Sequence, residues 1–258
     1  MMSALFVKRV GRGPRVVLLH GGVLAGELCW GRQLRLADRF TLEIVERAGY
    51  GRSRRVSPGE DLDADAPLVA GLLAEGAHLV GHSSGAVAAM LAAGRRPEAV
   101  LSLTLCEPPA FQLAPGSAEA QQMARDLEEH LHRTGDDAEW LRGFLGIVGR
   151  DVVIPDQLPP PLAQGVQAIR AVRRRPWEGV LPVDQLAAAP FPKLVISGDH
   201  SPAFDAVCDA LAARLRAQWA HVIGAGHATP DTGDAFNDTL EAFIGAVSAR
   251  RYDAAIPD

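Results

Sequence analysis

Short, mostly apolar runs recur along the chain, and longer amphipathic stretches separate them. Residues 15–19, 100–106 and 193–197 are runs of the kind found in strands that are buried on both faces. Residues 61–75 and 203–216 instead repeat their apolar side chains at helical spacing. This alternation predicts an α/β fold in which helices cover a mostly parallel sheet.

Less regular stretches complete the predicted order of elements. We expect further strands at residues 5–10, 40–46, 78–80 and 219–223, and further helices at 26–37, 84–94 and 235–249.

The strand rhythm disappears between residues 111 and 189, a stretch rich in arginine and proline with a helical pattern. We therefore predict a core formed by residues 1–110 and 190–258, interrupted by a helical cap at 111–189. Ligands of open α/β sheets bind beyond the carboxyl ends of the strands, and the insertion leaves the core at such an end. The cap is thus expected to act as a lid, and additional packing is the alternative.

Composition narrows the class of protein. A chain of 258 residues with 48% hydrophobic and 22% charged residues fits one globular core with an insertion. The net charge of −5 argues against a nucleic-acid partner. The three cysteines are widely spaced, which predicts neither a metal site nor a disulfide framework.

The same features bear on location. No apolar run approaches the length of about 18 residues that spans a bilayer, and residues 1–10 do not resemble a cleaved leader. We expect a reduced, cytoplasmic protein with a small-molecule substrate and no membrane partner. The sequence does not indicate an oligomeric state.

The pentapeptide Gly81-His82-Ser83-Ser84-Gly85 follows a predicted strand and precedes a predicted helix. A serine at the centre of this motif is presented on a sharp turn at a helix N-terminus, where free N–H groups can stabilise an oxyanion. Ser83 is therefore the candidate nucleophile. The alternative is a glycine-rich turn with an N-capping serine.

Two adjacent glycines, in the sequence His20-Gly21-Gly22, follow the strand predicted at residues 15–19. Its flexible backbone could direct the N–H of Gly22 or Val23 toward the same oxyanion as the N–H of Ser84. A plain turn is the alternative. We expect His20 itself to be structural.

A serine hydroxyl needs a general base. His227 ends the sequence Gly224-Ala225-Gly226-His227, shortly after the last predicted strand, which would bring it to the sheet end that carries Ser83. His200 is the alternative base. The histidines predicted within strands or on a helix fit the role less well: His78, His130, His132 and His221.

Four motifs together resemble the α/β-hydrolase superfamily: residues 20–22, 47–53, 81–85 and 224–227. They occur in the order expected for that superfamily, and the resemblance extends over nearly the whole chain. The resemblance implies a doubly wound, mostly parallel sheet of seven or eight strands and a Ser–acid–His triad. Only one strand fits before the turn at Gly11, which favours a reduced first hairpin and a sheet of seven strands over one of eight.

The acid departs from the family pattern. Ser201 occupies the position where the resemblance implies an aspartate. Glu107, at the end of the strand beside the nucleophile strand, is the preferred substitute, and Asp199 is the alternative. The third alternative is that the chain has no functional acid.

These residues predict a serine hydrolase that cleaves a small ester, lactone or thioester through an acyl-enzyme. The chemistry requires no metal and no organic cofactor. Two alternatives remain open: a cofactor-free non-hydrolytic enzyme of the cyclase, lyase or peroxidase type, and a ligand-binding protein with a vestigial triad.

Overall fold

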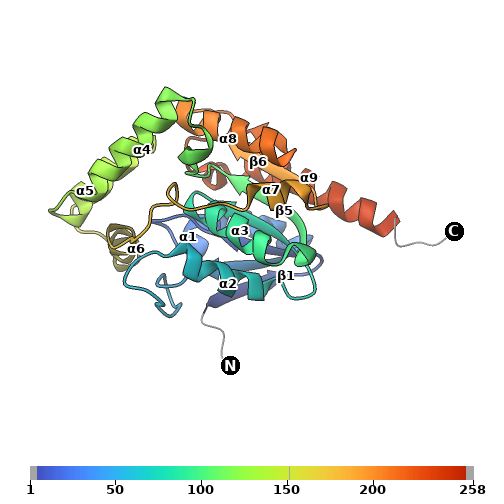
Figure 1. The fold of residues 1–258 in the computed structure, drawn as a ribbon. Helices are drawn as coiled ribbons and strands as arrows, with labels where there is room; N and C mark the ends of the chain where they lie inside the picture. The colour runs from blue at the N-terminus through green and yellow to red at the C-terminus, as the bar shows by residue number, and fades with distance from the viewer. Residues whose placement is uncertain (1–4, 151, 254–258) are drawn as a thin grey trace.

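A computed structural model describes residues 5–150 and 152–253, and its centre is a seven-stranded sheet (Figure 1). The spatial order is β1-β3-β2-β4-β5-β6-β7, in which β1 pairs antiparallel with β3 and all other neighbours are parallel. The mostly parallel sheet predicted from the sequence is confirmed, with seven strands. Their bounds are β1 Phe6–Gly11, β2 Arg15–Leu19, β3 Thr41–Glu46, β4 Ala77–His82, β5 Val100–Cys106, β6 Lys193–Ser197 and β7 Gln218–His221.

Alternate side chains of the central strands enter two separate hydrophobic clusters, which lie on opposite faces of the sheet. In β2, Val17 and Leu19 belong to one cluster, whereas Val16 and Leu18 belong to the other. This period of two is the geometric consequence of a pleated strand. Burial on both faces explains why the strands read as nearly continuous apolar runs.

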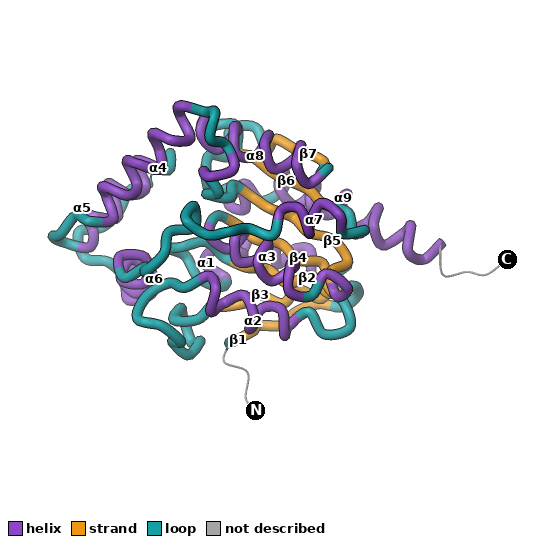
Figure 2. The backbone as a smooth tube through the Cα atoms, viewed as in Figure 1, coloured by secondary structure: helices purple, strands orange, loops and turns teal. Residues whose placement is uncertain are grey.

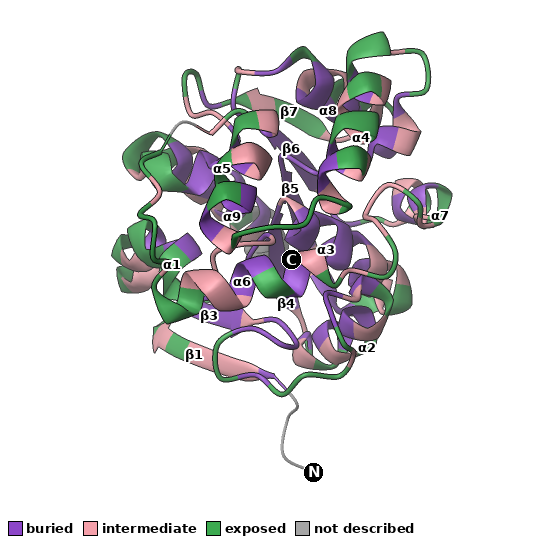
Figure 3. Ribbon diagram, turned by 90° about the vertical axis from the view of Figure 1, so that its left-hand side faces the viewer, coloured by how far each residue is buried: buried purple, intermediate pink, exposed green. Residues whose placement is uncertain are grey.

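Helices cover both faces in a three-layer arrangement (Figures 1 and 2). Helices α2 (Leu62–Leu72), α3 (Ser84–Arg95) and α8 (Pro202–Leu215) contribute to the larger cluster. Helices α1 (Glu27–Trp30) and α9 (Asp234–Asp253) contribute to the other. Figure 3 shows the resulting pattern, in which buried residues concentrate on the central strands and the inner faces of the helices, whereas the edge strands β1 and β7 contain no buried residue.

Two predicted elements differ from those observed. The helix expected at residues 26–37 is one turn of α-helix followed by the 3₁₀ helix η1 (Gly31–Asp38). Three residues per turn place Trp30, Gln33 and Leu36 on one face, and all three are buried. The last strand ends at His221, earlier than expected, because β7 is an edge strand and the chain turns at Gly224 with φ 69°.

The segment between β5 and β6 contains helices and, among its described residues, no strand. Its longer helices are α4 (Ala118–Leu131), α5 (Asp137–Ile147) and α6 (Pro160–Arg170), and the short α7 (Val183–Ala188) packs beside α3 and α8. A Cβ on Gly165 of α6 would lie 2.1 Å from the Val23 carbonyl oxygen, so α6 packs directly on the loop after β2. The division into a core and a cap domain remains a prediction. Three further 3₁₀ turns complete the described elements: η2 (Pro97–Ala99), η3 (Phe111–Leu113) and η4 (Thr229–Thr232).

None of the helices in the described part of the chain is both long enough and apolar enough to cross a membrane.

Candidate active site

Ser83 lies on the sharp turn between β4 and α3. Its φ of 54° is in the left-handed region, which a residue other than glycine adopts only when its surroundings enforce it. A Cβ on Gly81 would lie 2.4 Å from the Gly85 carbonyl oxygen, and a Cβ on Gly85 would lie 2.3 Å from that of His20. The turn therefore needs glycine on both sides of the serine, as the motif predicts.

The Ser83 hydroxyl contacts an imidazole that in turn contacts a carboxylate. Ser83 Oγ lies 3.0 Å from His227 Nε2, and His227 Nδ1 lies 3.2 Å from Glu107 Oε2. A carboxylate can only accept hydrogen bonds, so Nδ1 carries the proton and the lone pair of Nε2 faces Ser83. The structure thus brings together Ser83, His227 and Glu107, the residues that the sequence singled out for these positions.

Glu107 is fully buried at the end of β5, with a φ of 50°. The N–H of Gly198 donates to its Oε1 over 2.6 Å, and His200 Nε2 donates to its Oε2 over 2.9 Å. Burial alone would raise the pKa of the Glu107 carboxyl, but the hydrogen bonds from His200 and His227 outweigh it and lower this pKa. The carboxylate is therefore held in its anionic form.

The alternatives to these residues lie elsewhere. Asp199 follows β6 with an exposed side chain, and no hydrogen bond joins it to His227 in the described part of the chain. His200, the alternative base, bonds to Glu107 and not to Ser83. Ser201 is buried at the start of α8.

On the other side of Ser83, a fully buried arginine connects three segments. Arg47 donates to the carbonyl oxygens of His20 and Gly21 over 2.9 and 2.8 Å, and to Ser84 Oγ over 3.1 Å. It also forms ion pairs with Glu60 and Asp65. Burial would lower the pKa of Arg47, but the two carboxylates raise it, so the guanidinium stays charged.

This arginine orients the loop that was expected to form the oxyanion hole. Because the Gly21 carbonyl points at Arg47, the N–H of Gly22 in the same trans peptide points away from it. Gly22, Val23 and Ser84 all line the pocket that contains Ser83. His20 is buried and accepts the Arg47 N–H at Nε2 over 2.9 Å, consistent with the structural role expected of it.

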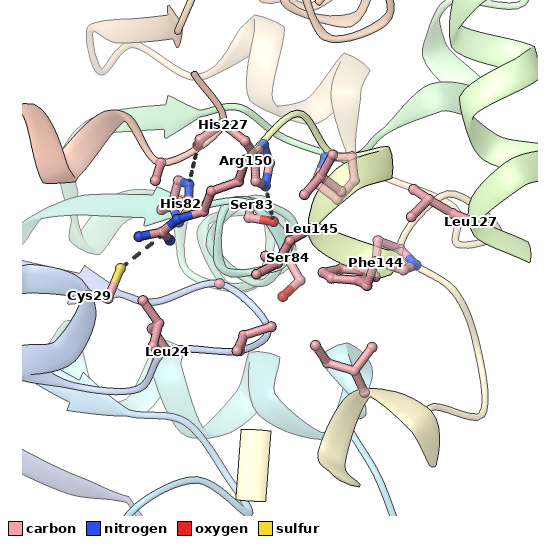
Figure 4. A pocket seen from close by; sticks show the side chains of 18 of the residues that line it. Leu24, Cys29, His82, Ser83, Ser84, Leu127, Phe144, Leu145, Arg150 and His227 are labelled. Atoms are coloured by element: carbon pink, nitrogen blue, oxygen red, sulfur yellow. Dashed lines mark hydrogen bonds between the residues drawn. The ribbon is translucent and has the colours of Figure 1, made fainter. Parts of the chain in front are cut away.

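The pocket above Ser83 has mainly apolar walls (Figure 4). Leu127, Phe144 and Leu145 come from α4 and α5, so the helical segment forms part of its wall. At its rim, Arg150 pairs with Asp231, which joins the end of the α5 region to the loop after His227. The pocket therefore combines mainly apolar walls with a charged pair from the cap segment and the His227 loop.

The sequence did not reveal two residues that support the loops of the site, His82 and Arg47. His82 lies inside the quoted motif, and its Nε2 donates to the His227 carbonyl oxygen over 2.7 Å. Burial lowers the pKa of His82 to about 3, so the ring is neutral and supports the His227 loop. Arg47 also lies inside a quoted motif, but its role depends on Glu60 and Asp65, and no local spacing pointed to this cluster.

Comparison with known proteins agrees with the fold. Residues 16–239 match the sequence model of the alpha/beta hydrolase family. A thermophilic esterase from Thermogutta terrifontis superposes with a TM-score of 0.69 at 23% identity, covering 94% of this chain and 93% of that one. At this identity the similarity establishes the fold alone.

Curated relatives match over shorter stretches. A pimeloyl-[acyl-carrier protein] methyl ester esterase of Methylococcus capsulatus is 40% identical over 117 residues, 43% of this chain and 44% of that protein. A 2-(acetamidomethylene)succinate hydrolase of Mesorhizobium japonicum is 37% identical over 103 residues, 38% of this chain and 37% of that protein. The chain thus aligns with less than half the length of these two relatives. The family match over residues 16–239, together with the sheet order and the serine turn, shows that the chain belongs to the alpha/beta hydrolase family.

Proposed function

We propose that this protein is a serine hydrolase that cleaves small carboxylic esters through an acyl-enzyme. The observation that carries the proposal is the chain of contacts from Ser83 Oγ through His227 to the buried carboxylate of Glu107. The names of the relatives, esterases and a hydrolase of a different small acid, support ester or related acyl chemistry without fixing the acyl group.

In this mechanism, Ser83 Oγ attacks the carbonyl carbon while His227 Nε2 takes its proton. The imidazolium that forms is stabilised by the anionic Glu107 at Nδ1. The N–H of Ser84 and that of Gly22 or Val23 hold the oxyanion, which binds more tightly than the ground-state carbonyl. His227 then protonates the leaving alcohol, and water releases the acid by the same steps in reverse order.

The apolar walls favour an aliphatic acyl group over a charged one near the scissile bond. Lactones and thioesters present the same acyl carbon and remain within the proposed class. A methyl ester is the natural first leaving group to test, since the name of one relative specifies it.

The test is hydrolysis of a series of methyl and nitrophenyl esters with acyl chains of increasing length. We expect turnover by the wild-type protein and a loss of at least about 10⁴-fold in Ser83→Ala, because removing the nucleophile leaves only the contribution of binding and the oxyanion hole. Equal thermal unfolding of the two proteins serves as the fold control. Comparable activity in both proteins would contradict the proposal.

A further inference from the structure

Glu107 has more partners than a triad needs. His200 Nε2 and His227 Nδ1 both approach its Oε2, at 2.9 and 3.2 Å. The three side chains follow three different strands, β5, β6 and β7, and their ligand atoms lie within 4.8 Å of one another. In the described part of the chain no hydrogen bond joins His200 to Ser83, and His200 takes up no proton in the proposed mechanism.

We propose that Glu107, His200 and His227 form a binding site for a zinc-like divalent cation, and that its occupation switches off the base. Two imidazole nitrogens and a carboxylate oxygen are ligands that Zn²⁺ prefers, whereas Ca²⁺ and Mg²⁺ prefer oxygen alone. Three protein ligands with a fourth position for water complete a tetrahedral set. This inference concerns ion binding and goes beyond the proposed ester chemistry.

Two of the three ligand separations are close to those of a zinc site. Ligands at about 2.0–2.1 Å around a tetrahedral zinc are separated by roughly 3.3 Å, a few tenths of an ångström more than the two hydrogen-bonded pairs here. The ligand atoms of His200 and His227 lie within 4.8 Å of each other and would move closer together around the ion. His200 lies on the loop after β6, and its side chain, 13% exposed, is the most exposed of the three ligands. A Cβ on Gly149 would lie 2.6 Å from His200 Nδ1, so the glycine leaves the space that the imidazole occupies.

Binding of the ion changes the tautomer of His227. When Nδ1 coordinates the metal, the proton of the neutral ring moves to Nε2, the nitrogen that faces Ser83. His200 exchanges its proton in the same way, from Nε2 to Nδ1, and neither ring changes its net charge. His227 Nε2 then has no lone pair to accept the Ser83 proton, so ion binding and general-base catalysis exclude each other.

The test measures Zn²⁺ binding directly, in the absence of ester, by titration of metal-free protein against a chromophoric chelator. We expect one ion per chain, the same affinity in Ser83→Ala, and a loss of at least about 10-fold in His200→Gln. Glutamine keeps an N–H donor for Glu107 but removes the imidazole ligand. Glu107→Gln, which removes the oxygen ligand, should weaken binding as well.

The matched control is His132→Gln, which removes an exposed histidine that pairs with Glu128 on α4 and should leave the affinity unchanged. Where esters are hydrolysed, activity should fall in parallel with occupancy and return on chelation. The proposal is overturned if the wild-type protein binds no Zn²⁺ up to millimolar concentration, or if His200→Gln binds as tightly as the wild type. Binding without ester hydrolysis would instead contradict the proposed function and leave the ion site standing.

Discussion

Two buried polar clusters flank Ser83, and they handle charge in opposite ways. On one side, the single carboxylate of Glu107 is held by two imidazoles and a backbone N–H. On the other side, the guanidinium of Arg47 is held by two carboxylates. The first cluster therefore presents an anion beside the imidazole of His227, whereas the second holds a buried cation whose charge two carboxylates stabilise.

This difference matches what each side must do in the proposed reaction. The acid side has to stabilise the positive charge that forms on His227 when it takes the Ser83 proton, so it presents an anionic carboxylate. The arginine side has to keep the loop of Gly21 and Gly22 in one orientation beside Ser84, so its charges are fixed. Substitutions on the acid side should therefore reduce turnover, and those on the arginine side should reduce stability.

The largest expected effect is on the acid side. Glu107→Gln should lower kcat/KM by roughly 10³- to 10⁴-fold, because an amide neither stabilises the imidazolium nor fixes the His227 tautomer. Asp199→Asn, in the neighbouring exposed loop, should change it by no more than about twofold. Steady-state kinetics on one ester with both variants makes the comparison, and the reverse ranking would contradict the role of Glu107.

A smaller effect, on stability, is expected on the arginine side. Arg47→Met should lower the free energy of unfolding by about 3–5 kcal/mol, because it leaves Glu60 and Asp65 buried without their cation. Arg39→Met is the matched control, since it breaks an exposed pair with Glu241 and should cost no more than about 1 kcal/mol. Urea unfolding measures both, and equal losses would show that the cluster does not hold the loop as described.

The smallest expected effect concerns His82, which meets the acid side through a hydrogen bond to the His227 carbonyl oxygen and through the His227 ring. Its pKa is about 3 in the folded protein, against an ordinary value of 6.5, because burial disfavours the charged ring. The unfolded chain therefore binds a proton between these values that the folded chain does not, and stability falls as the pH is lowered through this window.

Between pH 7 and pH 5, the wild type should lose about 2 kcal/mol more unfolding free energy than His82→Gln. The variant keeps a side-chain N–H for the His227 carbonyl but has no titrating group. His132→Gln, which removes an exposed imidazole, should behave as the wild type. Parallel pH profiles for the wild type and His82→Gln would show that the buried ring is not the source of the pH dependence.

The sequence predicted those parts of the molecule that depend on local pattern. The buried strands, the Ser83 turn and the late loop with His227 all carry short motifs whose chemistry is readable in one stretch. Glu107 could be proposed because Ser201 left the usual position without a carboxylate. Residues 26–37 were predicted as one helix because the 3.6- and 3-residue periods differ little over so short a stretch.

The remaining contacts join residues that are distant in the chain. Arg47 meets Asp65 and Glu60 across 18 and 13 positions of the chain, and His200 meets Glu107 across 93 positions. A single sequence does not specify such pairs. The sequence therefore indicated His200 only as the alternative base and did not predict its hydrogen bond to Glu107.

The central claim is that Ser83 is the nucleophile that His227 activates. Labelling with an alkyl fluorophosphonate followed by peptide mass spectrometry tests it most directly, because the adduct marks the attacking oxygen. We predict one adduct, on Ser83, that is absent in Ser83→Ala and forms much more slowly in Glu107→Gln. An adduct on another residue such as Ser84, or ester hydrolysis by a wild-type protein that the probe does not label, would contradict the account.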